Sequence, residues 1–156
     1  MNSAPNLNPL SIQTISSQFR FKRVIALKKP TVYLVDPDLS ALEEMQTLLS
    51  VLDVEIEKFT SAESFLLNER RIESTCLVVN FNLPGLSGLA LLEELRERDI
   101  CIPIVLIDNL GDVRRAVKAM RAGVVEYIEK PFADRLLLKA VGDAINALNE
   151  RDPGGV

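Results

Sequence analysis

Four short polar segments, each directly after an apolar run, carry the side chains best suited to chemistry. They are Asp36-Pro37-Asp38, Asn80-Phe81-Asn82, Asp108-Asn109 and Lys130-Pro131. Their acids could hold a divalent cation, since hard cations prefer oxygen ligands. The sequence contains no histidine, so Ser/His or Cys/His catalysis and metal binding through imidazole lack their usual central residue. Any site here is therefore expected to depend on oxygen ligands and one ammonium group.

The chain between these segments predicts a parallel sheet that positions them. From Pro30 onward, short apolar runs alternate with longer helical patterns, which is typical of a parallel sheet covered on both faces. The predicted strands are 31–35, 54–59, 75–79, 102–107 and 124–128. Right-handed crossovers give an α/β fold with a doubly wound five-stranded sheet, expected in the flavodoxin-like order 2-1-3-4-5. Because the carboxyl ends of parallel strands share one edge, this order would bring the four segments together.

The helical patterns carry start signals and apolar stripes. Asp38 or Ser40 is expected to cap the first helix, and Thr60 with Glu63 forms a capping-box pattern before the second. Gly123 is expected to end the fourth helix. The stripe of the fourth helix, expected to face the core, comprises Val113, Ala116, Val117 and Met120. The inward stripe of the last helix comprises Leu137, Val141, Ala144, Ile145 and Leu148.

The composition of the 156 residues predicts one domain with a basic extension. Hydrophobic residues make up 47% of the chain, enough for a full core. Residues 1–29 hold five bases and no acid and are expected to form a flexible extension, before a domain over 30–150 and a tail over 151–156. Beyond residue 29 the chain holds 13 bases against 22 acids. This balance argues against nucleic-acid binding by the domain, because phosphate contacts need clustered Lys and Arg.

Apolar runs and cysteines predict a cytoplasmic location. No apolar run approaches the roughly 18 residues of a membrane span, and the first residues lack a signal-peptide pattern. Cys76 and Cys101 both lie in apolar runs and are expected to be buried thiols rather than a disulfide or redox pair.

From Pro30 to Asn149 the sequence resembles the receiver domain of bacterial two-component response regulators. The resemblance rests on Asp36 at the end of the first strand, on the segment 82–88 after the third, and on Lys130-Pro131-Phe132 after the fifth. The stretch from Gly111 to Phe132 is most similar to receivers of regulators of the nitrogen-fixation type. The resemblance implies a domain that takes a phosphoryl group from a partner kinase onto an aspartate after the third strand.

Four positions retain the residue types of that family. In the family, an acidic pair after the first strand and a loop carbonyl hold Mg²⁺, while a hydroxyl residue, a lysine and an aromatic read the phosphoryl group. By resemblance, Asp36 is the first acid, Asn82 supplies the metal-binding carbonyl, Lys130 is the lysine and Tyr127 is the switch aromatic.

Three positions depart from the family. Pro37 stands where the second metal-ligating acid belongs, Asn80 where the acceptor aspartate belongs, and Asp108 where the hydroxyl residue belongs. An amide oxygen is a poor nucleophile toward phosphorus, because it lacks the charge of a carboxylate. The loss of acids also weakens the attraction for Mg²⁺. The resemblance therefore implies a degenerate receiver with no working phosphate acceptor.

The departures suggest specific contacts. Asp108 is expected to form a built-in ion pair with Lys130; the alternative is a solvated loop acid beside a turn at Asn109 and Gly111. The family implies a cis peptide at Lys130-Pro131. Tyr127 is expected to be a fixed, half-buried aromatic of an edge strand rather than a rotating switch.

The basic residues of the fourth helix have two interpretations. Arg114, Arg115, Lys118 and Arg121 form either a partner-docking face or an ordinary solvated surface.

The function predicted from these residues is a signalling module that binds proteins and is not an enzyme. Its contacts are expected through the fourth helix, fifth strand and fifth helix, with a sensor kinase, a regulator or a second copy in a homodimer. No DNA-binding output domain is expected after the fifth helix. One alternative is a phosphorylatable receiver that uses another acid, with Asp38 replacing Pro37 as the Mg²⁺ ligand. Another is a flavodoxin-like domain for a flavin or other small ligand, although no Gly-rich loop follows the first strand.

Overall fold

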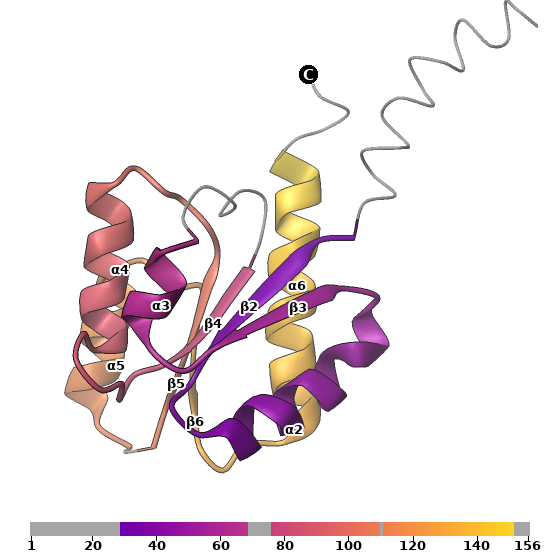
Figure 1. The fold of residues 1–156 in the computed structure, drawn as a ribbon, viewed down its shortest axis with the longest axis horizontal. Helices are drawn as coiled ribbons and strands as arrows, with labels where there is room; N and C mark the ends of the chain where they lie inside the picture. Colours follow the sequence, from indigo (N-terminus) through magenta and orange to yellow (C-terminus); the bar gives the residue numbers. More distant parts are fainter. Residues whose placement is uncertain (1–28, 69–75, 110, 152–156) are drawn as a thin grey trace, which may run out of the picture. The chain divides into compact units, whose positions relative to one another are not determined.

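The computed structural model describes residues 29–68, 76–109 and 111–151, which form a five-stranded parallel sheet with helices on both faces (Figure 1). The strands are β2 (Thr31–Val35), β3 (Glu55–Phe59), β4 (Cys76–Asn80), β5 (Ile104–Asp108) and β6 (Glu126–Glu129). Their order is β3-β2-β4-β5-β6, with every neighbouring pair parallel. The predicted order 2-1-3-4-5 is confirmed.

Within these described ranges, five α-helices and a short 3₁₀ helix lie between or after the strands. They are α2 (Leu39–Leu49), η1 (Ser50–Leu52), α3 (Ala62–Leu66), α4 (Gly88–Glu97), α5 (Val113–Arg121) and α6 (Asp134–Arg151). In Figure 1, α3, α4 and α5 lie on one side of the sheet, and α2 and α6 lie on the other.

Two apolar layers hold these helices on the sheet. Successive side chains of a strand point to opposite faces, so Tyr33 and Val35 pack with α3 and α4, whereas Val32 and Leu34 pack with α2 and α6. Each of the central strands β4 and β5 has five residues, and all of them are buried. Among the described residues, the chain has no helix with both the length and the apolar character needed to cross a bilayer.

The helix ends confirm some start and stop signals and correct one. Asp38 caps α2 by accepting a hydrogen bond from the backbone N–H of Ser40 at 2.9 Å, and Gly123 has the left-handed φ of 98° expected after α5. The predicted capping box at Thr60 is wrong, because Ser61 caps α3 instead. The carboxylate of Glu63 accepts from the N–H of Leu86, and this hydrogen bond lowers the pKa of Glu63.

The orientation predicted for α5 is wrong. Val113, Val117 and Met120 are exposed, with 76% of Val113 and 53% of Met120 open to solvent. The single buried residue of α5 is Ala119. The 3.6-residue period places Arg115 and Ala119 on the side opposite to the apolar stripe, and this is the side that faces the sheet.

The cysteines also differ from expectation. Cys76 is buried in β4, and burial raises the pKa of its thiol to about 12, so it stays protonated. Cys101 is exposed, because β5 begins only at Ile104 and leaves it in the preceding loop.

Several predictions concern parts of the chain outside the described residues. These parts are residues 1–28 of the extension predicted over 1–29, Thr75 and the tail after Arg151, together with the side chain of Leu148. In α6, Leu137, Val141 and Ala144 are buried as predicted and Ile145 is half-buried.

Candidate functional site

The four polar segments meet at the carboxyl edge of the sheet, where β2, β4, β5 and β6 end. Two buried carboxylates, Asp36 and Asp108, form the centres of two side-chain clusters there. The sheet order produces this meeting, because β2 and β5 both lie next to β4. The predicted convergence of the segments is therefore observed.

The Asp36 cluster comprises Asp36, Asn80 and Lys130. Oδ1 of Asp36 accepts from the backbone N–H of Asp38 at 2.8 Å, and Oδ2 accepts from Nδ2 of Asn80 at 3.0 Å. The ammonium group of Lys130 lies 3.5 Å from Oδ2. Asn80 also accepts, through Oδ1, from the N–H of Asn82 at 2.9 Å. Both ends of the Asn80 amide are therefore occupied within the protein.

The Asp108 cluster comprises Asp108 with Asn82, Asn109, Arg115 and Tyr127. Oδ1 of Asp108 accepts from the N–H of Asn109 at 2.8 Å, from the Arg115 guanidinium at 3.0 Å and from the Asn82 amide at 3.4 Å. Oδ2 accepts from the Tyr127 hydroxyl at 2.6 Å and lies 2.9 Å from Nε of Arg115. No part of the Asp108 side chain is exposed to solvent, so these donors replace its water.

The prediction that Asp108 pairs with Lys130 is wrong, because Asp108 forms its ion pair with a different cation. The Lys130 ammonium faces Asp36, and the cation beside Asp108 is Arg115. Lys130 contacts Asp108 through the backbone, donating its N–H to the Asp108 carbonyl at 2.8 Å. The alternative of a solvated loop acid is also wrong, because Asp108 is the buried last residue of β5.

Arg115 is the site residue that the sequence analysis placed elsewhere. Its guanidinium lies 3.8 Å above the ring of Phe81 and donates to Oδ1 of Asn82 at 2.9 Å. Its side chain is 20% exposed, so it does not belong to the exposed basic face formed by Arg114, Lys118 and Arg121. Its position four residues before Ala119, opposite the apolar stripe, is the sequence signal that could have indicated this.

Tyr127 and Lys130 take the positions expected from the edge strand β6. Tyr127 is half-buried, and the Lys130-Pro131 peptide is cis, as predicted. Burial raises the pKa of the Tyr127 phenol, and the hydrogen bond and charge of Asp108 raise it further. The phenol therefore remains a hydrogen-bond donor at neutral pH.

The residues at this edge do not fit a Mg²⁺ ion. Pro37 offers no side-chain ligand, and the Asp38 carboxylate caps α2. Asn80 directs its NH₂ group toward Asp36, where a metal ligand would need to present oxygen. Among the described residues, no three His, Cys, Asp or Glu side chains gather closely enough to hold a metal ion.

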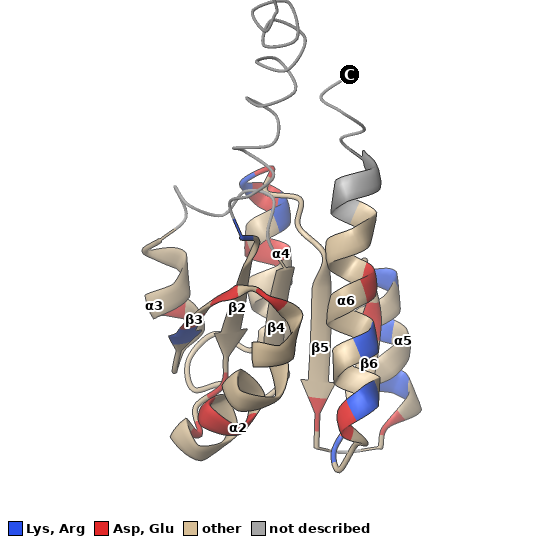
Figure 2. Cartoon of the chain, turned by 90° about the vertical axis from the view of Figure 1, so that its right-hand side faces the viewer, with Lys and Arg blue, Asp and Glu red and all other residues tan. Residues whose placement is uncertain are grey.

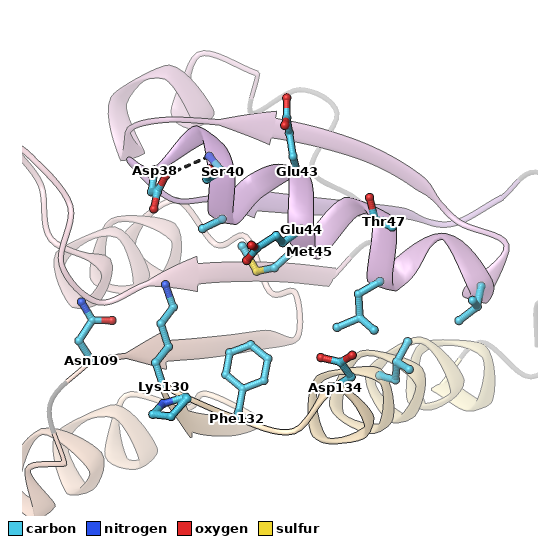
Figure 3. A pocket seen from close by; sticks show the side chains of 15 residues that line it. Asp38, Ser40, Glu43, Glu44, Met45, Thr47, Asn109, Lys130, Phe132 and Asp134 are labelled. Atoms are coloured by element: carbon cyan, nitrogen blue, oxygen red, sulfur yellow. Dashed lines mark hydrogen bonds between the residues drawn. The ribbon is translucent and has the colours of Figure 1, made fainter.

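A groove of about 1320 Å³ runs between α2 and the start of α6 (Figure 3). Asp38 and Lys130 lie at one end, and Met45 and Phe132 contribute apolar surface. Its acids outnumber its single lysine and are Asp38, Glu43, Glu44 and Asp134. This charge does not suit the phosphate group of a flavin nucleotide, so the groove offers no support for a flavin site.

Comparisons with known proteins identify the family. Residues 32–142 match the response regulator receiver domain. The chain is 38% identical over 127 residues to nodulation protein W of Bradyrhizobium diazoefficiens, covering 81% of this chain and 54% of that protein. It is 35% identical over 111 residues to the transcriptional regulatory protein FixJ of Rhizobium meliloti, covering 71% and 54% respectively. The crystal structure of FixJ-N is similar with a TM-score of 0.70 and 34% identity, covering 75% of this chain and 94% of that one.

The chain therefore belongs to the response regulator receiver domain family of two-component signalling, as the sequence motifs predict. It spans about half the length of the two relatives. Receiver domains interact with kinases and other proteins and are in general not enzymes.

Proposed function

We propose that this receiver domain acts through protein contacts and does not accept a phosphoryl group at Asn80. The hydrogen bond between the Asn80 amide and Asp36, at 3.0 Å, carries the proposal. An aspartyl phosphate forms when a charged carboxylate attacks phosphorus. The Asn80 amide has no such charge, and its oxygen already accepts from the N–H of Asn82.

The weak capacity for binding a divalent cation also supports the proposal that the domain is not phosphorylated. A receiver with a working acceptor needs a divalent cation to offset the charge of the incoming phosphoryl group. The side chain of Pro37 cannot ligate, and Asp38 already accepts from the N–H of Ser40. A phosphorylatable receiver that uses Asp38 and another acid would have to break this cap.

The proposed binding surface comprises α5, β6 and the start of α6. Exposed apolar side chains gather on it, namely Val113, Val117, Met120, Val125 and Leu136. Lys and Arg lie along α5 (Figure 2), where Arg114, Lys118 and Arg121 are exposed. Such a surface fits a protein partner with apolar and acidic side chains. The proposed partners are a sensor kinase, a regulator or a second copy of this chain.

A second copy is the partner to test first, because the same region also supplies acids. Glu126 and Glu129 are exposed on the edge strand β6, beside the basic helix α5. A two-fold contact presents the same patch twice and can pair bases of one copy with acids of the other. Sedimentation of the wild type and of Val117→Glu tests this interface: a dimer that the substitution dissociates supports it, and a monomer at all concentrations contradicts self-association.

Intact mass after incubation with Mg²⁺ and acetyl phosphate tests the phosphorylation proposal. The matched control is the double variant Pro37→Asp/Asn80→Asp, which restores both acids. We expect no phosphoryl adduct on the wild type and an adduct on the double variant. An adduct on the wild type would overturn the proposal and direct mapping to Asp36, Asp38 and Asp108.

A further inference from the structure

Helix α5 is attached to the sheet in an unusual way. Its apolar residues Val113, Val117 and Met120 face solvent, and Ala119 is its single buried residue. A surface helix normally gains most of its stability by burying an apolar stripe. The small buried surface of α5 means that polar contacts must contribute a large part of what holds it in place.

At the start of α5 those polar contacts converge on one carboxylate, and at its end Arg96 of α4 donates to the carbonyl of Ala122. Asp108 accepts hydrogen bonds from side chains on separate parts of the chain: Asn82 after β4, Arg115 in α5 and Tyr127 in β6. The backbone N–H of Asn109 is a further donor. A single buried anion at the end of β5 therefore connects the loop after β4, the first turns of α5 and the edge strand β6.

Arg115 makes the most specific of these contacts. One terminal nitrogen of its guanidinium donates to Oδ1 of Asp108 at 3.0 Å, and Nε lies 2.9 Å from Oδ2 as a close charge contact that does not have hydrogen-bond geometry. The ring of Phe81 covers one face of the guanidinium at 3.8 Å. Moving α5 away from the sheet would leave the fully buried carboxylate without its cation.

We propose that Asp108 is a built-in anionic ligand that holds α5 and β6 in one arrangement, so that the α5–β6–α6 surface is presented without any added phosphoryl group. The inference rests on the proposed function and extends it by naming the positioning residues, Asp108 and Arg115. The Asp108 carboxylate occupies the hydrogen-bond donors that an added anion would need, because donors from α5, β6 and two loops already surround it.

A double-mutant cycle measures whether the pair acts as a unit. The variants are Asp108→Asn, Arg115→Gln and the double variant, with Arg114→Gln as the matched control on the exposed face of α5. We expect each single substitution to lower the equilibrium constant for folding, measured by urea unfolding. In the double variant this constant should be at least about tenfold larger than the value expected if the two single effects were independent. Additive effects would overturn the proposal.

Amide hydrogen exchange measures whether the pair holds α5 in place. In Asp108→Asn, exchange of the α5 amides is expected to accelerate by about tenfold relative to those of α4, because local opening becomes easier. Arg114→Gln should leave this ratio unchanged. An unchanged ratio in Asp108→Asn would overturn the proposal. If Asp108→Asn does not fold, Tyr127→Phe removes one donor to Asp108 and keeps the ring; the same comparison then decides.

The two proposals fail separately. A phosphoryl adduct on the wild type overturns the proposed function and does not alter the coupling between Asp108 and Arg115. Additive effects with no adduct on the wild type overturn this inference and leave the proposed function standing.

Discussion

The Asp36 and Asp108 clusters lie on the same edge of the sheet, and each buries one carboxylate, but they satisfy it differently. Asp36 has an amide, a backbone N–H and a lysine 3.5 Å away. Asp108 has an arginine at 2.9 Å and a tyrosine hydroxyl at 2.6 Å. The Asp36 cluster joins strand ends and a loop, whereas the Asp108 cluster also reaches α5. The comparison indicates that the second cluster determines where the proposed binding surface lies.

Removing the cation of each cluster should reveal the largest difference between the two clusters in their contribution to stability. Arg115→Ala leaves the buried carboxylate of Asp108 without its counter-charge and is expected to lower the free energy of unfolding by about 3 kcal/mol. Lys130→Ala removes an ammonium group that is 31% exposed, and we expect a loss of about 1 kcal/mol. Urea unfolding at neutral pH measures both. Equal losses would contradict the distinction between the clusters.

Adding a charge to the Asp36 cluster should have a smaller effect than removing Arg115. Asn80→Asp replaces the donor to Asp36 by a second carboxylate, and we expect the free energy of unfolding at pH 7 to fall by about 2 kcal/mol. Protonation of either carboxylate would remove the repulsion, so the loss should shrink as the pH is lowered. Asn146→Asp, at an exposed position of α6, is the control and should change stability little. Unchanged stability of Asn80→Asp would contradict the proximity of the two side chains.

The titration of Tyr127 reports on the Asp108 cluster at high pH. Of the changes considered, it is expected to have the smallest effect on stability. Burial, the hydrogen bond to Asp108 and the charges of Asp108 and Glu129 raise the pKa of the phenol, against the opposing charge of Arg115. A raised pKa in the folded state means that this contribution to stability is complete below the unfolded pKa and is lost as the pH rises through the folded one. Tyrosine ¹³C chemical shifts measure the titration. Asp108→Asn should lower the pKa of Tyr127, and an unchanged pKa would contradict the contact.

The sequence was sufficient for the sheet and for half of the site. Alternating apolar runs predicted the strands, and the flavodoxin-like topology with right-handed crossovers predicted their order. Asp36, Asn80 and Lys130 were expected on one edge because the carboxyl ends of parallel strands share that edge. The partner of Asp108 was not predictable in the same way. Lysine and arginine both have long side chains, and choosing between them required knowing which side of α5 faces the sheet.

The orientation of α5 was the point at which periodicity misled. Hydrophobic periodicity shows that a helix has an apolar side, and the usual assumption is that this side faces the core. In α5 the apolar side faces solvent and the side with Arg115 and Ala119 faces the sheet. Cys101 shows the same limit, since its apolar neighbours belong to a strand that begins only at Ile104.

The most direct test of the central claim is the amide NMR spectrum of the wild type with and without Mg²⁺ and acetyl phosphate. If Asp108 already holds α5 and β6 in place and Asn80 takes no phosphoryl group, the α5 and β6 amides of the wild type show no chemical-shift changes, while Pro37→Asp/Asn80→Asp responds at the end of β4. Saturable shifts along α5 and β6 of the wild type would contradict it.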